Sequence, residues 1–455
     1  MKVMKFGGAA VRDGSSMRRV AAIVAAADGP RVVVTSAMHG VTDRLVASLR
    51  GVREDESSVF VLLDDLRRQH HEALGEVARD GDEAAAYAVN TALERLERLL
   101  YGIAYTQEAT DRITDLVQSF GERLAAPVLA AALRAAGLKA SAMDAEHAGI
   151  RSMGPFGNAR PDMDNLRAET GANLLPLTDA GQVPVVTGFY GVDRDGHATL
   201  FGRGGSDYVA ALLARALDAD ALELWKDVPG FLTTDPRAVP AARLVPSMGY
   251  DEAAELAHFG AKVLHPRCVE PLEDAGIPIH IRCFLDPEAA GTVVQQEVDH
   301  APELVRSVAC KGGLAMLRLN GPGMAYTPGV AKRVFNQLAD AGVNVLNMST
   351  SQATFALLLD EQDLRGAEDA LRPLLGGVMQ SIEALPGRSL VCVVGRGLGQ
   401  TPGSAATILE SVSRASVNVE MISLGASDIA LDFIVQNEDA AAALQALHAR
   451  FLETP

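Results

Sequence analysis

The carboxy-terminal third of the chain contains an internal repeat, which constrains the fold more than any other feature of the sequence. Residues 327–344 match residues 401–418 at a constant offset of 74 positions, and Ser349 and Ser423 keep the same register. Each copy predicts a strand, a loop with Thr-Pro-Gly, a helix and two further strands. Agreement at so many spaced positions indicates two similar modules of about 70 residues each.

The amino-terminal part predicts alternating strands and helices. A strand at residues 2–6, an amphipathic helix at 15–27 and a buried strand at 31–35 make a β-α-β unit, the building block of a parallel sheet. Further strands are expected at 138–143, 183–189, 221–225, 278–282 and 292–294, and helices at 43–135, 162–180, 208–217 and 250–263. This alternation predicts an α/β sandwich, followed by a polar linker at 298–302.

Length, charge and cysteine content exclude several classes of protein. A chain of 455 residues predicts two or three domains, and 58 acidic against 41 basic residues argue against a nucleic-acid or anionic membrane partner. The four cysteines form no CxxC pair, so neither a zinc site nor a disulfide framework is expected. Without a targeting signal or an apolar stretch of about 20 residues, a soluble cytoplasmic protein is expected.

A glycine-rich loop at residues 201–207 is the first candidate binding site. It carries three glycines in four positions, and Ser206 or Asp207 is expected to cap the helix at 208–217. A loop that leads into a helix N-terminus suits anionic oxygen, and Arg203 has a planar fork for a carboxylate or phosphate. The alternative is a plain glycine-rich turn with a solvated arginine.

Lys5 precedes Gly7 and Gly8 at the carboxyl end of the first strand, a pattern typical of a phosphate cradle. It is not a Walker loop, since no Gly-x-x-x-x-Gly-Lys-Ser/Thr occurs in the chain. The alternative is that Lys5 is a solvated charge at a strand end. The histidines show no metal-ligand spacing, so no metal site is predicted from protein ligands and His265 is interpreted as structural.

Five motifs in chain order give the sequence a specific resemblance. They are Lys5-Phe-Gly-Gly8, Ser119-Phe-Gly-Glu-Arg-Leu124, Gly202-Arg-Gly-Gly-Ser-Asp207, Thr234-Asp-Pro-Arg237 and Phe259-Gly-Ala-Lys-Val-Leu-His265. With them the chain resembles the aspartate kinases of the amino-acid kinase family, almost from end to end, and the repeat is similar to their paired ACT modules. The resemblance implies a three-layer α/β/α sandwich plus two βαββαβ (ferredoxin-like) ACT modules.

The same resemblance implies domain boundaries at 1–297 for the catalytic domain, 303–385 for ACT module 1 and 386–455 for ACT module 2, the last possibly interleaved with 303–314. Since the chain stops where the second module stops, no fused homoserine dehydrogenase is expected.

The implied reaction converts ATP and L-aspartate into ADP and 4-phospho-L-aspartate with Mg²⁺, the first step toward lysine, threonine and methionine. Feedback inhibition by lysine or threonine and a homodimer or homotetramer formed through the ACT modules are also implied. The corresponding effector-binding positions are Thr327, Pro328, Gly329, Val330, Asn344 and Ser349.

The acceptor site matches the family pattern at every position. The positions that would surround aspartate are Ser36, Ala37, Thr42, Glu122, Phe189, Arg203 and Ser206. Arg203 would hold the α-carboxylate and Glu122 the ammonium group, although Glu122 could instead be an exposed helix residue. Lys5 would contact the transferring phosphoryl group and Asp207 would orient Lys5 or part of the phosphate site, so that catalysis is mostly charge neutralisation.

The nucleotide site departs from the family pattern. Its implied residues are Lys5, Gly7, Gly8, Lys226, Asp227, Asp235, Arg237, Lys262 and Val263. Lys226 stands where the family usually has threonine and Leu232 where it has tyrosine, and Ala9 and Ala10 replace Thr-Ser. Lys226 either adds a phosphate contact or points to solvent. These changes leave two alternatives open: a related kinase of another amino acid, and a catalytically weak amino-acid sensor.

Overall fold

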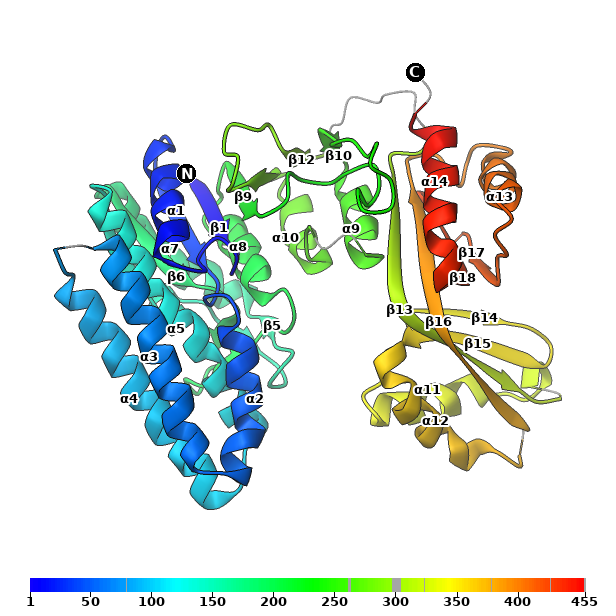
Figure 1. Cartoon of the computed structure of the whole chain (residues 1–455), viewed down its shortest axis with the longest axis horizontal. Helices are drawn as coiled ribbons and strands as arrows, with labels where there is room; N and C mark the ends of the chain where they lie inside the picture. The colour runs from blue at the N-terminus through cyan, green and yellow to red at the C-terminus, as the bar shows by residue number, and fades with distance from the viewer. Residues whose placement is uncertain are drawn as a thin grey trace. The chain divides into compact units, whose positions relative to one another are not determined.

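The computed structural model describes residues 1–78, 80–260, 263–296, 304–322, 324–377, 379–425 and 427–453. The chain forms two compact units, shown in one colour gradient in Figure 1. The first unit contains Met1–Phe231, Pro246–Tyr250 and Val263–Val298; the second contains Leu232–Val245, Asp251–Lys262 and Asp299–Pro455. The domain boundaries expected from the sequence stay predictions.

An eight-stranded mixed sheet forms the centre of the first unit. Its order is β10-β12-β11-β9-β1-β2-β6-β3. The strands are β1 (Lys2–Phe6), β2 (Arg31–Thr35), β3 (Lys139–Met143), β6 (Gln182–Thr187), β9 (Ala221–Lys226), β10 (Ser247–Met248), β11 (Ile279–Cys283) and β12 (Thr292–Val294). All neighbours are parallel except β11 and β12. The central strands are buried on both faces, as parallel strands between two helix layers must be.

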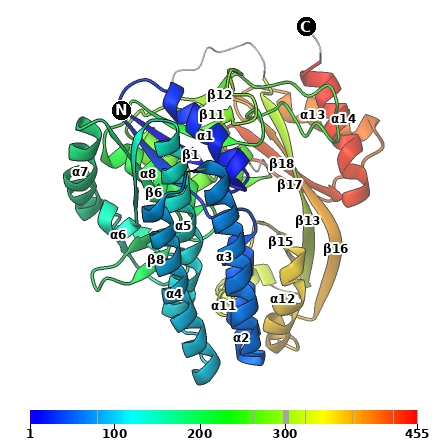
Figure 2. The same ribbon diagram turned by 60° about the vertical axis from the view of Figure 1, so that its left-hand side comes forward.

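Helices cover both faces of this sheet and confirm the predicted three layers. Helices α1 (Gly14–Ala26) and α5 (Asp111–Ala135) lie on one face, and α7 (Met163–Asp179) and α8 (Gly205–Ala216) on the other. The long helical region predicted from the sequence contains α2 (Val41–Glu54), α3 (Ser57–Val77) and α4 (Glu83–Thr106), which run alongside α5 in Figure 2. Within the described ranges, no helix has the length and apolar character needed to cross a membrane.

Local sequence explains where several of these helices begin. Asp13, Asp82, Thr110 and Asp162 precede α1, α4, α5 and α7, and each side chain accepts a hydrogen bond from the backbone N–H three residues later. These caps satisfy N–H groups that have no partner inside the helix.

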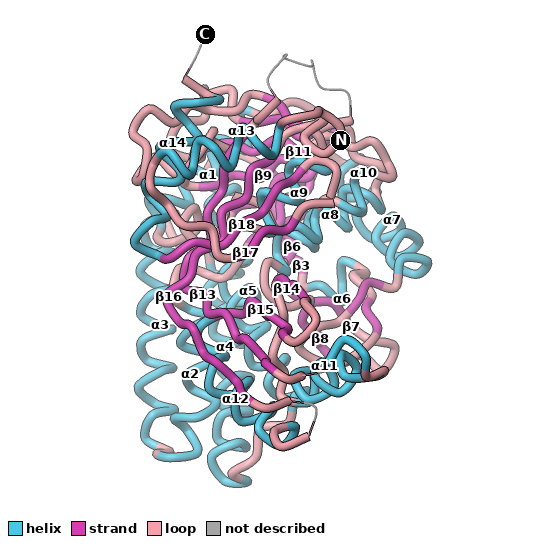
Figure 3. The backbone as a smooth tube through the Cα atoms, turned by 90° about the vertical axis from the view of Figure 1, so that its right-hand side faces the viewer, coloured by secondary structure: helices cyan, strands magenta, loops and turns pink. Residues whose placement is uncertain are grey.

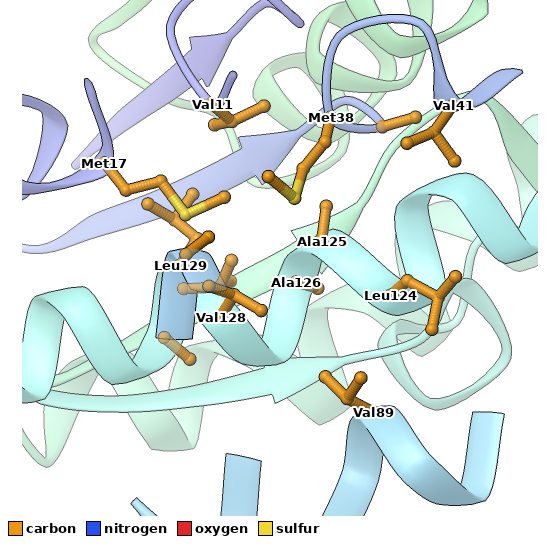
Figure 4. Packing of buried hydrophobic residues seen from close by; sticks show 14 of the residues in the cluster. Val11, Met17, Met38, Val41, Val89, Leu124, Ala125, Ala126, Val128 and Leu129 are labelled. Carbon is orange, nitrogen blue, oxygen red and sulfur yellow. The ribbon is translucent and has the colours of Figure 1, made fainter. Parts of the chain in front are cut away.

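Helix α5 is buried over most of its length, and small residues line it. Figure 4 shows Ala125 of α5 beside Met38, and Val128 and Leu129 of the same helix near Met17, in a core of buried side chains. Alanines let the helix approach the sheet closely, and the two methionines of this view fill the remaining gaps. Met38 therefore anchors the loop after β2 to α5.

Short elements complete the first unit. They are α6 (Ala145–Ala148), β4 (Ser152–Met153), β5 (Arg160–Pro161), β7 (Tyr190–Val192), β8 (Ala198–Leu200), η1 (Pro266–Cys268) and α10 (Glu270–Glu273). The strands β4 with β5 and β7 with β8 form two small antiparallel sheets.

A six-stranded antiparallel sheet forms the second unit, in the order β14-β15-β13-β16-β18-β17. Its strands are β13 (Ser307–Asn320), β14 (Asn347–Thr350), β15 (Thr354–Asp360), β16 (Ser381–Val394), β17 (Met421–Ser423) and β18 (Ala430–Gln436). Its helices are α9 (Tyr250–His258, except its first residue), η2 (Met324–Tyr326), α11 (Val330–Asp340), η3 (Glu361–Asp363), α12 (Leu364–Leu371), η4 (Arg372–Leu374), α13 (Ser404–Arg414), η5 (Asn437–Asp439) and α14 (Ala440–Phe451).

The repeat predicted from the sequence is confirmed by these elements. Strands β13 and β16 begin and end 74 residues apart, and so do helices α11 and α13. The two long strands lie side by side in Figure 3. Residues 314–320 of β13 pair with β15, whereas residues 307–311 pair only with residues 390–394 of β16, the half that pairs with β18. Each long strand therefore belongs to both modules.

The segment Leu232–Val245 packs within the second unit, which the sequence did not predict. Thr233 Oγ1 lies 3.0 Å from His448 Nε2 of α14, and Ser307 Oγ donates to the Leu232 carbonyl at 2.8 Å. The buried side chain of Val239 belongs to the apolar cluster formed by α13, α14, β16 and β18.

Leu129→Ala should destabilise the first unit by about 2–5 kcal/mol, because it removes a fully buried side chain and leaves a cavity. Trp225 is the single tryptophan and lies in the same core cluster, so urea unfolding followed by its fluorescence reports this change. Leu175→Ala, at a side chain that is 38% exposed, is the matched control and should change stability by less than about 0.5 kcal/mol. Equal shifts in the two variants would contradict this description of the core.

Candidate active site

A cavity of about 300 Å³ lies in the first unit, beside the carboxyl ends of β1 and β2. The carboxyl edge of a parallel sheet is the usual place for a ligand in α/β proteins. The residues that line the cavity are Lys5, Gly8, Ser36, Ala37, Met38, His39, Gly40, Thr42, Asp43, Glu122, Phe189, Gly204, Gly205, Ser206 and Asp207.

The Asp207 carboxylate is paired with two ammonium groups. Lys5 contacts Oδ1, and Lys226 Nζ lies 2.5 Å from Oδ2. Burial lowers the pKa of Lys5, an effect that Asp207 partly offsets. Burial alone would raise the pKa of Asp207, but the two ammonium groups hold it well below its usual range. The carboxylate is therefore charged at any physiological pH.

The prediction that Ser206 or Asp207 caps helix α8 is wrong. The helix begins at Gly205, with Gly204 as the cap in a left-handed conformation (φ 74°), so both side chains lie in the first turn. A Cβ at Gly204 would lie 2.3 Å from the ring of His265, so glycine is required here for space as well as for conformation. This early start turns Asp207 toward β1 and β9 instead of toward the backbone of its own helix.

Glu122 is the second charged feature of the cavity, and it is not the exposed helix residue of the alternative interpretation. It is buried, and its Oε1 accepts hydrogen bonds from the Ala37 N–H (3.1 Å) and Ser206 Oγ (3.3 Å). Its Oε2 has no hydrogen-bond partner among the described residues. Burial raises the pKa of Glu122 to about 8, because the charged form loses its hydration.

Two neighbours of Glu122 set its position. A Cβ at Gly121 would lie 2.7 Å from the Cβ of Ala37, so the glycine allows α5 to touch the loop after β2. Arg123 pairs on the far side with Asp144 and with Glu146 (2.9 Å), and its guanidinium lies 4.8 Å from the centre of the Tyr190 ring. These contacts fix the rotation of α5 and direct Glu122 into the cavity.

Phe189 lines the cavity in a strained conformation. Its φ of 74° is unusual for a bulky residue, and its carbonyl accepts a hydrogen bond from the Phe201 N–H at 3.1 Å. Strain of this kind persists only where the surroundings fix it, and it clusters at functional sites.

Arg267 supports the glycine-rich loop from outside the cavity. Its guanidinium donates to the Phe201 carbonyl at 2.6 Å and to the Ala159 carbonyl at 3.2 Å, and it lies 4.6 Å from the centre of the Tyr208 ring. The loop is therefore held in place at both of its ends. The motif reasoning did not identify Arg267, which lies just beyond the last matched motif.

The structure brings together most of the residues predicted for the acceptor and phosphate sites. Those that line the cavity are Lys5, Gly8, Ser36, Ala37, Thr42, Glu122, Phe189, Ser206 and Asp207. Gly7 lies next to the ammonium group of Lys5. Arg203 is exposed and does not line the cavity, although its neighbour Gly204 does.

The remaining nucleotide-site residues are not gathered around this cavity. Lys226 touches Asp207 from outside, Asp227 is exposed and Val263 is half-buried. Asp235 and Arg237 belong to the second unit, where they pair with each other at 2.6 Å. Lys262 lies outside the described residues.

Sequence reasoning missed four residues that line the cavity: Met38, His39, Gly40 and Asp43. They continue the loop from Ser36 and Ala37 into the first turn of α2, whereas Gly204 and Gly205 belong to the glycine-rich loop that was predicted to bind. Contiguity with two predicted residues was the signal that could have found them.

The predicted effector residues lie in the first ACT-like module. The loop of Thr327, Pro328 and Gly329 leads into α11, and Val330 begins that helix. Ser349 lies in the edge strand β14, and Asn344 follows α11 at its other end; both side chains are exposed. Their assignment to one effector site stays a prediction.

One group outside the cavity resembles a metal site. Ligand atoms of Asp193, Asp195 and His197 approach one another within 4.8 Å in the β7–β8 turn. Asp193 already accepts hydrogen bonds from the backbone N–H groups of Asp195 and His197, which closes the turn. The turn geometry therefore accounts for the cluster.

Comparison with known proteins identifies the family. Residues 1–283 match the amino acid kinase family, and residues 310–373 and 391–451 each match an ACT domain. The chain is 35% identical over 462 residues to lysine-sensitive aspartokinase 3 of Escherichia coli (strain K12), with 99% of both chains covered. The chain belongs to the aspartokinase family. Aspartokinases carry out ATP-dependent phosphorylation of aspartate under allosteric regulation, so the predicted reaction class is confirmed.

Other relatives agree with this family. The chain is 30% identical to the chloroplastic bifunctional aspartokinase/homoserine dehydrogenase 1 of Arabidopsis thaliana, of which it spans only 51%. The crystal structure of E. coli aspartokinase III in complex with aspartate and ADP (R-state) matches with a TM-score of 0.85 and 32% identity over 100% of both chains. The complex of the same enzyme with lysine and aspartate (T-state) matches with the same TM-score at 33% identity. The predicted fold class is thereby confirmed.

Glu122→Gln should change both substrate binding and stability in a pH-dependent way. Below about pH 8 the wild-type carboxyl group is protonated, so binding of an ammonium group requires release of a proton. The KM for aspartate should therefore fall about tenfold per pH unit from pH 6 to 8 and then level off. In the Gln variant this dependence should vanish and KM should be about 10- to 100-fold higher at pH 8.

The same substitution, Glu122→Gln, should weaken substrate binding but increase the stability of the protein. A folded-state pKa of about 8, above the ordinary 4.5, makes Glu122 increasingly destabilising as pH rises through this window. Glu122→Gln should be more stable by a few kcal/mol at pH 8, with the difference shrinking toward pH 5. A pH-independent difference in urea midpoint would contradict the buried, neutral state of Glu122.

Proposed function

We propose that this aspartokinase transfers the γ-phosphoryl group of ATP to the β-carboxylate of L-aspartate at the cavity of the first unit, and so forms 4-phospho-L-aspartate. The observation that carries the proposal is that one cavity holds an unpartnered carboxyl oxygen and a lysine ammonium group. The unpartnered Oε2 of Glu122 offers a place for an ammonium group, and Lys5 beside Asp207 offers positive charge for phosphate. The E. coli relative crystallised with aspartate and ADP has the same fold.

In this proposal the acceptor amino acid is held at both of its α-substituents. Glu122 takes the ammonium group, and Arg203 reaches the α-carboxylate from the loop that borders the cavity. Ser36, Ala37, Thr42, Phe189 and Ser206 form the remaining walls. A hydroxy acid would leave Glu122 without its partner, which explains selection of an amino acid.

The proposed transfer needs no general base. The β-carboxylate is anionic near neutral pH and can attack phosphorus directly. Lys5, together with the N-terminus of α8 at Gly205 and Ser206, would neutralise charge on the transferring group. Asp207 would orient Lys5, because their ion pair fixes the ammonium group at the end of β1.

The nucleotide contacts and Mg²⁺ remain proposals. Gly7, Gly8 and Lys5 would border the phosphates, while the roles of Asp227, Asp235, Arg237, Lys262 and Val263 stay predictions from the sequence. Of the carboxylates at the cavity, Asp207 is taken by two ammonium groups and Glu122 is buried, so only Asp43 is exposed. These residues of the cavity do not form a dedicated Mg²⁺ site.

Aspartate-dependent hydroxamate formation from ATP tests the reaction, since hydroxylamine traps an acyl phosphate. Lys5→Met should lower kcat by about 100- to 1000-fold, because it removes charge stabilisation from the transferring group. Lys2→Met, on the same strand but paired with Glu223 at 2.9 Å, is the matched control and should keep its activity.

Other outcomes of this assay would replace the proposal. Hydroxamate formed with another amino acid from a panel, and not with aspartate, would indicate a related kinase. Binding of lysine or threonine without any turnover would indicate an amino-acid sensor.

We further propose that lysine or threonine inhibits the enzyme through the ACT modules, which would also form a homodimer or homotetramer in the cytoplasm. The E. coli relative is named lysine-sensitive and was crystallised with lysine. The effector would contact Asn344, Ser349 and the loop of Thr327, Pro328, Gly329 and Val330.

Ser349→Ala should raise the effector concentration for half-inhibition by about tenfold, because a hydroxyl contact would be lost. The kcat without effector should be unchanged, since Ser349 is in the second unit. Ser423→Ala, at the same register of the second module, is the matched control and should leave inhibition unchanged. The reverse pattern would place the effector in the second module.

A further inference from the structure

The segment Leu232–Val245 has almost no regular structure of its own. Every residue of this segment is described, and it contains no helix or strand beyond an isolated bridge between Leu232 and Leu244. A segment of this length without secondary structure is usually either functional or disordered. Its fixed conformation must therefore come from contacts with other elements.

Helix α14 supplies one of these contacts through His448. The imidazole is fully buried, with Nε2 3.0 Å from Thr233 Oγ1 and Nδ1 3.0 Å from Glu453 Oε1. Thr233 Oγ1 already accepts a hydrogen bond from the Arg243 N–H at 2.9 Å, so its own hydrogen can be donated to Nε2. All three groups are satisfied when His448 carries its hydrogen on Nδ1 and donates it to Glu453.

The same end of the chain holds the segment at three further points. Gln445 Nε2 of α14 donates to the Ala238 carbonyl at 3.0 Å, and the Arg243 guanidinium donates to the Leu452 carbonyl. The buried side chain of Val239 packs in the apolar cluster that includes residues of α14. The region 391–451, which matches an ACT domain, therefore contributes the helix that orders this segment.

The ordered segment presents Arg237 to solvent in a fixed position. Asp235 pairs with the Arg237 guanidinium at 2.6 Å and also accepts a hydrogen bond from the Arg237 N–H at 2.9 Å. The side chain of Arg237 is nevertheless 90% exposed. An exposed guanidinium suits phosphate oxygens, and a group that is ordered before binding loses less entropy when it binds.

We propose that His448 is a positioning residue for ATP binding, which acts through Thr233 on the segment that carries Asp235 and Arg237. This inference rests on the proposed function, in which those two residues are predicted nucleotide contacts. His448 itself touches neither substrate. Its hydrogen bond keeps the segment ordered in the free enzyme, so that binding of ATP does not have to order it.

Hydroxamate formation, measured separately against ATP and against aspartate, tests the proposal in the full-length chain. Thr233→Val and His448→Asn should each raise the KM for ATP by about tenfold, because one ordering hydrogen bond is lost. The KM for aspartate and the kcat at saturating ATP should be unchanged. An Asn amide lies near the position of Nδ1 and can keep the contact with Glu453, but it does not reach Thr233.

Two conservative variants should restore binding. A Gln amide at position 448 lies near the position of Nε2, so His448→Gln should bring the KM for ATP to within about threefold of the wild-type value. Thr233→Ser keeps the hydroxyl group and should behave in the same way. If His448→Asn does not fold, the comparison of Thr233→Val with Thr233→Ser decides the question.

A merely structural role of His448 would give a different pattern. An unchanged KM for ATP in Thr233→Val, an equal rise of both KM values, or no difference between the Asn and Gln variants would overturn the proposal. Ser389→Ala is the matched control, because it removes another buried hydroxyl of the second unit, which bonds Asn437 Oδ1 at 2.7 Å. It should leave both KM values unchanged.

Failure of this proposal can be distinguished from failure of the proposed reaction. Calorimetry with a non-hydrolysable ATP analogue measures nucleotide affinity without turnover. A wild-type enzyme that forms hydroxamate, with Thr233→Val and His448→Asn binding the analogue as tightly as the wild type, would remove only the role of His448. A wild-type chain that forms no hydroxamate, with weaker binding of the analogue in the two variants, would remove only the proposed reaction.

Discussion

The paired charges on Asp207 determine how the first unit builds its site. Strand β1 lies far in the sequence from helix α8 and strand β9, and Asp207 joins the ends of all three through Lys5 and Lys226. Because the carboxylate is buried, losing either partner would leave charge without compensation. Parallel register places the two lysines on one face, and the left-handed Gly204 starts α8 early enough to present Asp207 between them.

The surroundings of Asp207 and Glu122 give these two acidic side chains of the cavity opposite protonation states. Asp207 remains charged because ammonium groups surround it, whereas Glu122 is neutral at neutral pH because the effect of its burial outweighs its hydrogen bonds and the charge of Lys5. Such divergence is how a site assigns different tasks to chemically similar groups. The contacts of Arg123 support this arrangement, because they hold α5 with Glu122 directed into the cavity.

Strand and helix order, the repeat and most residues around the cavity could be predicted from the sequence, because periodicity and glycine-rich turns are local signals. The resemblance implies Lys5 as a partner of Asp207, but Lys226 as its second partner could not be predicted, since that pair depends on register between strands distant in the chain. Residue type favours Ser206 or Asp207 as the cap of α8, but Asp207 instead forms ion pairs with Lys5 and Lys226 from the first turn of the helix. The inclusion of Leu232–Val245 in the second unit could not be predicted either, because its contacts are with residues that lie 75 to 215 positions later.

The long strands β13 and β16 have a consequence for how the second unit can change during evolution. Neither module has a complete sheet of its own, because residues 307–311 pair only with the second module while the rest of β13 serves the first. Within a regularly paired stretch, one added residue would turn the side chains that follow it from core to solvent. The pairing of β13 with β16 shifts register between Lys311 and Met316, where a bulge absorbs such a change. Length variation in this unit is therefore expected at these bulges and in the loops.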